Sequence, residues 1–155
     1  MAELNIGDIT LTSNGALQGR VAFAAQQNGG SSGTNTNDAT QVFQTEALDT
    51  HSAYNNSTGV FVAPVTGVYF FYAQLMGNST DNRSVHYISK STNGGGAWSW
   101  LVQFGGTADN YNQFTTHVIA SLNANDQVAV KNSNYANNLY TSCNQEAQFG
   151  GYLIG

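Results

Sequence analysis

The residues best suited to catalysis in this 155-residue chain are three histidines, His51, His86 and His117, together with many serines and aspartates. A histidine that takes a proton from a serine hydroxyl would create a nucleophile for acyl transfer. Such chemistry needs a fixed arrangement, and the sequence has no nucleophile elbow, no HExxH helix and no cysteine–histidine pairing to provide one. Because combinations of serine, histidine and aspartate arise by chance in a chain of this composition, we predict no enzymatic activity.

Carbohydrate recognition is a second chemistry that the residue types suggest. Aromatic rings beside neutral polar groups bind sugars by stacking and hydrogen bonding. Tyr111, Tyr135 and Tyr140 lie in or beside polar loops and are the candidate glycan contacts. Trp98 and Trp100 share one face of a strand if that strand is regular. For the two tryptophans we favour packing in the core or in an interface.

The composition argues against nucleic acid binding and against insertion into a membrane. Charged residues make up 8% of the chain, against about 25% in typical soluble proteins, and the net charge is -5. The cations are scattered along the sequence at Arg20, Arg83, Lys90 and Lys131. Nucleic acid binding needs clustered Lys and Arg. The most apolar stretch, Val60–Met76, is interrupted by proline, glycine and glutamine and falls short of the roughly 20 apolar residues that a bilayer requires.

The single cysteine and the first residues bear on redox state and export. Cys143 has no second cysteine to pair with, which excludes an internal disulfide bond and a cysteine-rich metal site. We expect it to pack as a small hydrophobic residue. The opening MAELNIGDITLTSNG lacks a basic segment and a continuous apolar segment, so we expect no signal peptide.

The elements that must position all these residues are β-strands. No window of a dozen residues places apolar side chains at helical spacing without a glycine or an asparagine-rich interruption. Short apolar or alternating runs recur instead, separated by polar, glycine-rich or asparagine-rich stretches. These runs are Val21–Ala25, Thr40–Phe43, Gly59–Ala63, Val68–Leu75, Val85–Ile88, Trp98–Phe104, Phe114–Leu122, Gln127–Val130 and Phe149–Ile154. The spacing predicts one all-β domain with the architecture of a sandwich.

The run from Val68 to Leu75 is apolar on both of its sides. Successive side chains of a strand point to opposite faces. Val68, Phe70 and Tyr72 therefore share one face, and Tyr69 and Phe71 share the other. Neither face suits contact with water.

The aromatic residues of this region follow a specific spacing. In order they involve Phe43, Asp49, Tyr54, Phe61 and the segment Gly67–Phe71. This pattern resembles the signature of the globular head of complement C1q, with a departure at Ala73, where the signature has an aromatic residue. Other segments agree with the family in the right order, namely VAFAA at the opening strand, LNANDQVAV at a turn and strand, and QFGGYLIG at the closing strand. The resemblance covers Val21 to Gly155.

The resemblance implies a ten-stranded jelly-roll sandwich of the C1q and tumour necrosis factor type that associates as a compact homotrimer. We assign Val68, Phe70 and Tyr72 to the trimer interface, and the reverse assignment of the two faces is the alternative. The predicted core residues are Phe23, Phe43, Tyr54, Phe61, Tyr69, Phe71 and Phe149. Residues 21–155 form the jelly-roll domain, and residues 1–20 form an N-terminal arm that anchors the protein to another molecule, or an extra edge strand.

The resemblance suggests calcium as a possible ligand, because relatives of this fold sometimes bind it near the trimer axis. Asp81, Asp109 and Asp126 lie in predicted loops, where turn formation is the alternative role. No loop has the spacing of an EF-hand. We therefore predict no cofactor, and we leave open whether a calcium ion binds.

The setting of such a trimer has two interpretations. Animal members of the family usually carry a secretory signal and often a collagen stalk, and this chain shows neither. We expect a phage or viral virion surface protein, either a capsid decoration (cement) protein or a fibre or needle tip that binds a host receptor. Residues 1–20 would contact capsid or tail proteins. The alternative is a soluble extracellular C1q-like lectin or ligand-binding protein, with a glycan or receptor as its partner.

Overall fold

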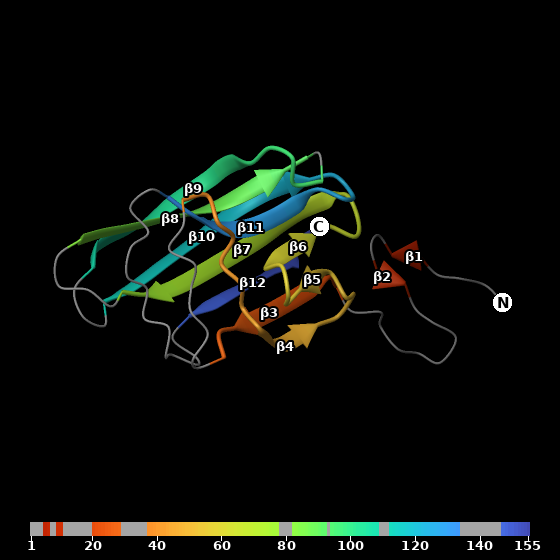
Figure 1. Cartoon of the computed structure of the whole chain (residues 1–155). Helices are drawn as coiled ribbons and strands as arrows, with labels where there is room; N and C mark the ends of the chain where they lie inside the picture. Colours follow the sequence, from red (N-terminus) through yellow and green to blue (C-terminus); the bar gives the residue numbers. More distant parts are fainter. Residues whose placement is uncertain are drawn as a thin grey trace.

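A computed structural model describes residues 5–6, 9–10, 20–28, 37–77, 82–92, 94–108, 112–133 and 147–155 of the chain. In these ranges every regular element is a β-strand, and no helix could cross a membrane. The strands, labelled in Figure 1, are β1 (Asn5–Ile6), β2 (Ile9–Thr10), β3 (Ala22–Gln26), β4 (Thr45–Asp49), β5 (Tyr54–Asn55), β6 (Val60–Val62), β7 (Gly67–Met76), β8 (Asn82–Ser91), β9 (Ser99–Ala108), β10 (Gln113–Leu122), β11 (Gln127–Asn132) and β12 (Gln148–Leu153).

Ten of these strands form two five-stranded antiparallel sheets. The first sheet has the order β10-β7-β12-β3-β4, and the second has the order β5-β6-β11-β8-β9. Figure 1 shows them as the two layers of a sandwich. Neighbours within a sheet are mostly distant in sequence, as in the pairing of β7 with β12. The prediction of an all-β, ten-stranded jelly roll is confirmed.

The alternation along β7 separates the core from the outside. Tyr69, Phe71, Ala73 and Leu75 are fully buried between the sheets, whereas Val68 on the opposite face is 37% exposed. The period of two in the strand puts these sets on opposite faces. The strand therefore contributes a complete face to the core and leaves a second apolar face outside it.

An aromatic cluster around Phe23 forms the centre of the core. The ring of Phe23 stacks on Phe61 with centroids 4.8 Å apart and meets the edge of Phe149 at 5.0 Å. Such ring pairs contribute about 0.5–1.5 kcal/mol beyond the burial of their area. The residues predicted for the core all lie in this buried cluster, which contains Phe23, Phe43, Tyr54, Phe61, Tyr69, Phe71 and Phe149.

Tyr54 ties the chain before β4 to the core. Its hydroxyl accepts a hydrogen bond from Phe43 N at 3.1 Å and donates one to Phe43 O at 3.2 Å. Burial raises the pKa of Tyr54 far above its ordinary value. The hydroxyl thus stays neutral and satisfies both backbone groups of a residue that no sheet ladder reaches.

The first residues contribute a separate small sheet. Asn5 pairs with Thr10 and Ile6 with Ile9, and among the described residues β1 and β2 pair with each other and not with either large sheet. The division of the chain at residue 20, and the choice between an arm and an extra edge strand, remain predictions.

Candidate functional site

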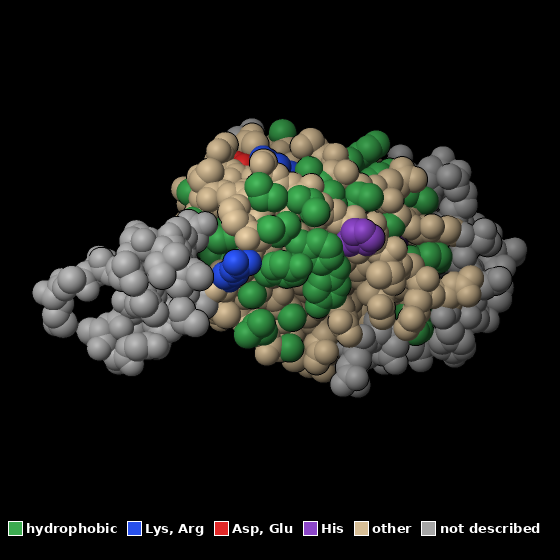
Figure 2. Space-filling view, turned by 180° about the vertical axis from the view of Figure 1, so that it is seen from behind, with side chains coloured by type: hydrophobic (Ala, Val, Ile, Leu, Met, Phe, Trp, Pro, Cys, Tyr) green, Lys and Arg blue, Asp and Glu red, His purple; other side chains and the backbone are tan. Residues whose placement is uncertain are grey.

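The outer side of the first sheet carries an apolar surface, which we call the open face. It consists of alternate residues on three adjacent strands, namely Val68, Phe70 and Tyr72 on β7, His117 and Ile119 on β10, and Tyr152 on β12. Ile119 is 62% exposed and Tyr152 is 45% exposed. Figure 2 shows hydrophobic side chains gathered into one patch with a histidine at its border.

Phe70 lies at the centre of the open face. In the sheet register it stands opposite Ile119 on one side and opposite Tyr152 on the other. Its ring centroid is 5.3 Å from that of Tyr152 and 5.9 Å from the imidazole of His117, to which it is nearly parallel. The rings thus pack against each other within one subunit and form a continuous surface.

Tyr72 lies flat across the sheet because β12 provides room for it. Gly150 is its register partner, and a Cβ atom at Gly150 would lie 2.5 Å from Cε1 of Tyr72. Burial under these contacts raises the pKa of the Tyr72 phenol. Sequence reasoning missed Gly150, although the pair Gly150-Gly151 inside an apolar strand was a signal, because glycine in a strand often marks close approach.

The structure therefore places the three residues predicted for the trimer interface together on the side of β7 away from the core. It adds His117, Ile119 and Tyr152 from neighbouring strands, which the sequence could not bring to them without the strand order. None of the six side chains is an acid, a lysine or an arginine. Such a face suits a large apolar partner better than a charged ligand.

One histidine takes part in an arrangement that resembles a hydrolytic triad. Ser84 Oγ is 2.8 Å from His86 Nε2, and His86 Nδ1 is 3.2 Å from Asn132 Oδ1. Because the amide oxygen of Asn132 can only accept, Nδ1 carries the proton and Nε2 accepts from the serine. Ser84 and His86 are 0% exposed and Asn132 is 2% exposed, so no substrate reaches them. Burial lowers the pKa of His86 to about 4.

His51 and Asp49 line a hollow on the surface, and both form hydrogen bonds within the turn to which they belong. The hollow, of about 660 Å³, lies between the β4–β5 connection and the β6 end of the sandwich. The Asp49 carboxylate there accepts hydrogen bonds from the backbone N–H groups of His51, Ala53 and Tyr54. His51 Nδ1 is 2.9 Å from Thr50 Oγ1. These contacts describe a turn held by an aspartate rather than a catalytic pair.

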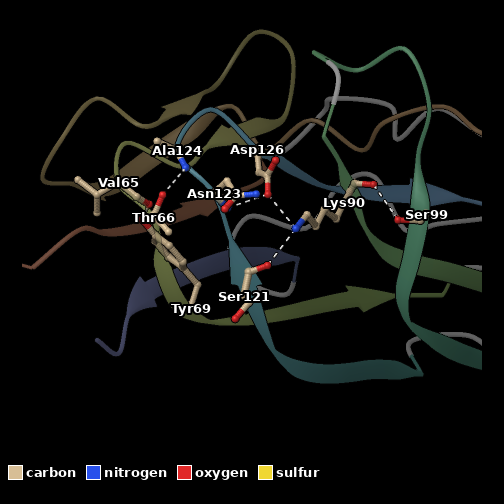
Figure 3. A network of polar contacts seen from close by, with 9 residues as sticks. All are labelled: Val65, Thr66, Tyr69, Lys90, Ser99, Ser121, Asn123, Ala124 and Asp126. Atoms are coloured by element: carbon tan, nitrogen blue, oxygen red, sulfur yellow. Dashed lines mark hydrogen bonds and ion pairs between the residues drawn. The ribbon is translucent and has the colours of Figure 1, made fainter.

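Asp126, considered above for calcium, has a charge partner within the protein. Lys90 Nζ lies 2.8 Å from Asp126 Oδ2 and donates to Ser121 O at 2.9 Å (Figure 3). The same carboxylate oxygen accepts from Asn123 N at 2.8 Å. The hydrogen bond from Lys90 holds the pKa of Asp126 below its usual range. The network links β8 of the second sheet to the end of β10 in the first.

The two tryptophans, which we expected in the core or in an interface, lie outside the buried core, and their packing in an interface stays a prediction. Trp98 is half-buried, with Lys131 Nζ 5.0 Å from its ring centroid, whereas Trp100 is 67% exposed. Of the remaining candidates, some lie outside the described residues, namely Tyr111, Tyr135, Tyr140, Asp81, Asp109 and Cys143. Across the part of the chain that is described, no group of three or more His, Cys, Asp or Glu residues could hold a metal ion.

Comparisons with known proteins agree with this geometry. A family model described as the C1q domain matches residues 22–154. The globular domain of zebrafish complement 1qA protein superposes with a TM-score of 0.67 at 17% identity, covering 88% of this chain and 98% of that chain. Murine APRIL gives a TM-score of 0.67 at 15% identity, over 88% of this chain and 100% of its own. Eiger TNF from S. frugiperda gives 0.65 at 18% identity, over 88% and 94%.

Proposed function

Because this chain belongs to the C1q domain family, we propose that it acts as a non-enzymatic recognition module that assembles into a homotrimer through the open face. Domains of the C1q and TNF type form homotrimers and bind receptors or ligands. The observation that carries the proposal is the continuous apolar surface centred on Phe70. It faces away from the core that already buries Tyr69 and Phe71.

The apolar side chains of the open face favour association of the subunits. Fully burying one large apolar side chain contributes about 1.5–3 kcal/mol. Each subunit offers several such side chains on the open face, among them Phe70, Ile119 and Tyr152. Three copies that bury them together would recover part of this contribution for each side chain, which offsets the cost of association, whereas a monomer would leave the surface in water.

Light scattering coupled to size-exclusion chromatography tests the assembly. The wild-type chain should elute at three times the subunit mass of 16.5 kDa. Phe70→Glu places an unpaired charge in the centre of the face and should give monomer or aggregate. Ser57→Glu introduces the same charge on the exposed β5–β6 turn and should leave the trimer intact. A monomeric wild type, or a trimeric Phe70→Glu variant with unchanged stability, would refute the proposal.

The proposal also concerns where the module acts, either outside the cell or on the surface of a virion. Members of the family are typically secreted or extracellular, which supports a ligand-binding role outside the cell. A virion surface is the other setting, and the separate pairing of β1 with β2 supports an N-terminal arm that docks on a capsid or tail protein. Quantitative mass spectrometry of particles purified from the source culture separates the two. Near-stoichiometric copies relative to the shell protein indicate a decoration protein, a few copies indicate a fibre tip, and absence refutes the virion setting.

A further inference from the structure

Trp100 forms a flat aromatic platform on the outer side of the second sheet. Its ring stacks on that of Tyr87, with centroids 4.2 Å apart and an interplanar angle of 3°. Tyr87 is 8% exposed, whereas Trp100 is 67% exposed. One face of the indole is therefore supported by Tyr87, and the other is open to solvent.

The backbone under the platform holds the indole in place. Tyr87 belongs to β8, and Trp100 belongs to the neighbouring strand β9. The register shifts by one residue here, because Ser89 pairs with Trp100 while Ile88 pairs with Val102. A bulge of this kind re-aims a side chain relative to a regular strand. The position of Trp100 in β9 and its stacking on Tyr87 hold the ring in place before a ligand binds. Binding would therefore cost little conformational entropy at this side chain.

The described neighbours of the platform are polar, and the charged one among them is Lys131, which pairs with Tyr87 from β11. Gln103, which is exposed, stands opposite Tyr87 in the register. Lys131 carries the nearby positive charge, and it is 7% exposed and engaged with Trp98 and with Asp38 Oδ1 at 3.8 Å. The other exposed large hydrophobic residues lie on different strands and turns, at Leu48, Val65, Val68, Ile119, Tyr152 and Ile154.

These features select one class of ligand. A single-stranded nucleic acid also stacks on aromatic rings, but it needs a basic groove, and the chain has a net charge of -5. A protein partner would need an extended exposed apolar area around the tryptophan, and the described residues beside it do not form one. A pyranose ring presents C–H groups on one face and hydroxyl groups around its edge. It matches one aromatic plane bordered by neutral hydrogen-bonding groups.

We propose that Trp100, supported by Tyr87, is a binding platform for neutral carbohydrate, with Gln103 as a hydrogen-bonding neighbour. The platform and the open face lie on opposite sides of the sandwich, because β9 belongs to the second sheet and β7 to the first. The inference rests on the proposed recognition role and names its ligand class. In the trimer proposed above the platform would occur three times, and multivalent glycans would bind with enhanced avidity.

Binding of the full chain to immobilised oligosaccharides ending in galactose, glucose, mannose or N-acetylglucosamine tests the inference. The wild type should bind at least one of these probes. Trp100→Leu keeps an apolar side chain but removes the aromatic plane, and it should lower the affinity about tenfold or more. Trp100→Phe keeps a ring and should retain most of the binding. Leu48→Ala, on β4 of the other sheet, is the matched control and should bind as the wild type does.

A second measurement requires no variant. The chain has two tryptophans, so its NMR spectrum shows two indole N–H signals. The same oligosaccharide, free in solution, should shift the signal of Trp100 and leave that of Trp98 in place. No binding to any probe at millimolar concentration, unchanged binding by Trp100→Leu, or a shift confined to Trp98 would overturn the inference. A trimer that binds none of the probes would refute the platform and leave the assembly proposal standing, whereas a monomer that binds would do the reverse.

Discussion

Acidification should destabilise the fold through His86. The imidazole is 0% exposed and lies between Ser84 and Asn132, with the ring of Phe104 5.6 Å away. Burial lowers the pKa of His86 from its ordinary 6.5 to about 4. The unfolded chain therefore binds a proton at this residue between pH 6.5 and pH 4 that the folded chain does not bind.

The sign and size of the effect follow from this difference. Because the unfolded state binds more protons in that window, the stability contribution is complete above pH 6.5 and is lost as the pH falls towards 4. At pH 5 the loss relative to pH 7 amounts to about 2 kcal/mol per subunit, and it reaches about 3 kcal/mol below pH 4. A loss of 2 kcal/mol corresponds to a decrease in Tm of roughly 4–8 °C for a domain of this size.

Thermal unfolding at a fixed protein concentration between pH 4.5 and pH 7.5 measures the effect. The wild type should show the fall in Tm, and His86→Gln should show a flatter pH dependence, whatever its absolute stability. His51→Gln removes an exposed histidine and should keep the wild-type slope. The reasoning is refuted if the wild type and His86→Gln have the same slope in this range, since other groups would then account for all of the acid sensitivity.

Two further predictions concern the backbone and the ion pair that join neighbouring elements. Gly105→Ala should destabilise the protein by about 3 kcal/mol, because φ at this position is +129° and a Cβ atom would collide with the carbonyl oxygen of Ser84. Urea unfolding measures this change, and an unchanged midpoint would contradict the prediction. Lys90→Met should raise the pKa of Asp126 towards its ordinary value, because the hydrogen-bonded ammonium is lost; an unchanged titration of its carboxyl carbon by NMR would show that other groups hold it.

The sequence predicted the strands better than their arrangement. The alternation in the run from Val68 to Leu75 identifies a strand with two apolar faces because side-chain direction depends only on local backbone geometry. The pairing of β7 with β12 joins residues that are far apart in the chain, and no local pattern specifies it. The jelly-roll architecture was predicted from the resemblance to a family, and the order of strands within each sheet came only with the structure.

The sequence could predict the candidate site only in part, because local alternation groups residues of one strand but not residues of different strands. Val68, Phe70 and Tyr72 could be grouped from one strand, whereas His117 and Tyr152 join them only through the register of the sheet. The sequence left the core and an interface open for Trp100, because the register shift in β9 beside it has no clear sequence signal.

The distribution of polar and aromatic groups gives a physical reason to regard this chain as a binding module. Among the described residues, two groups with catalytic potential have partners inside the protein: His86 is buried with Ser84 and Asn132, and Asp126 is paired with Lys90. Aromatic rings lie on the outer faces of both sheets: Phe70 is half-buried on the first sheet and Trp100 is exposed on the second, and neither ring exchanges protons. A surface of this kind acts through shape and apolar contact, and the two faces of the sandwich offer it in two forms. Under the two proposals, the broad face of the first sheet packs against copies of the same chain and the single indole of the second sheet binds a sugar ring, so separate mutations should change assembly and recognition.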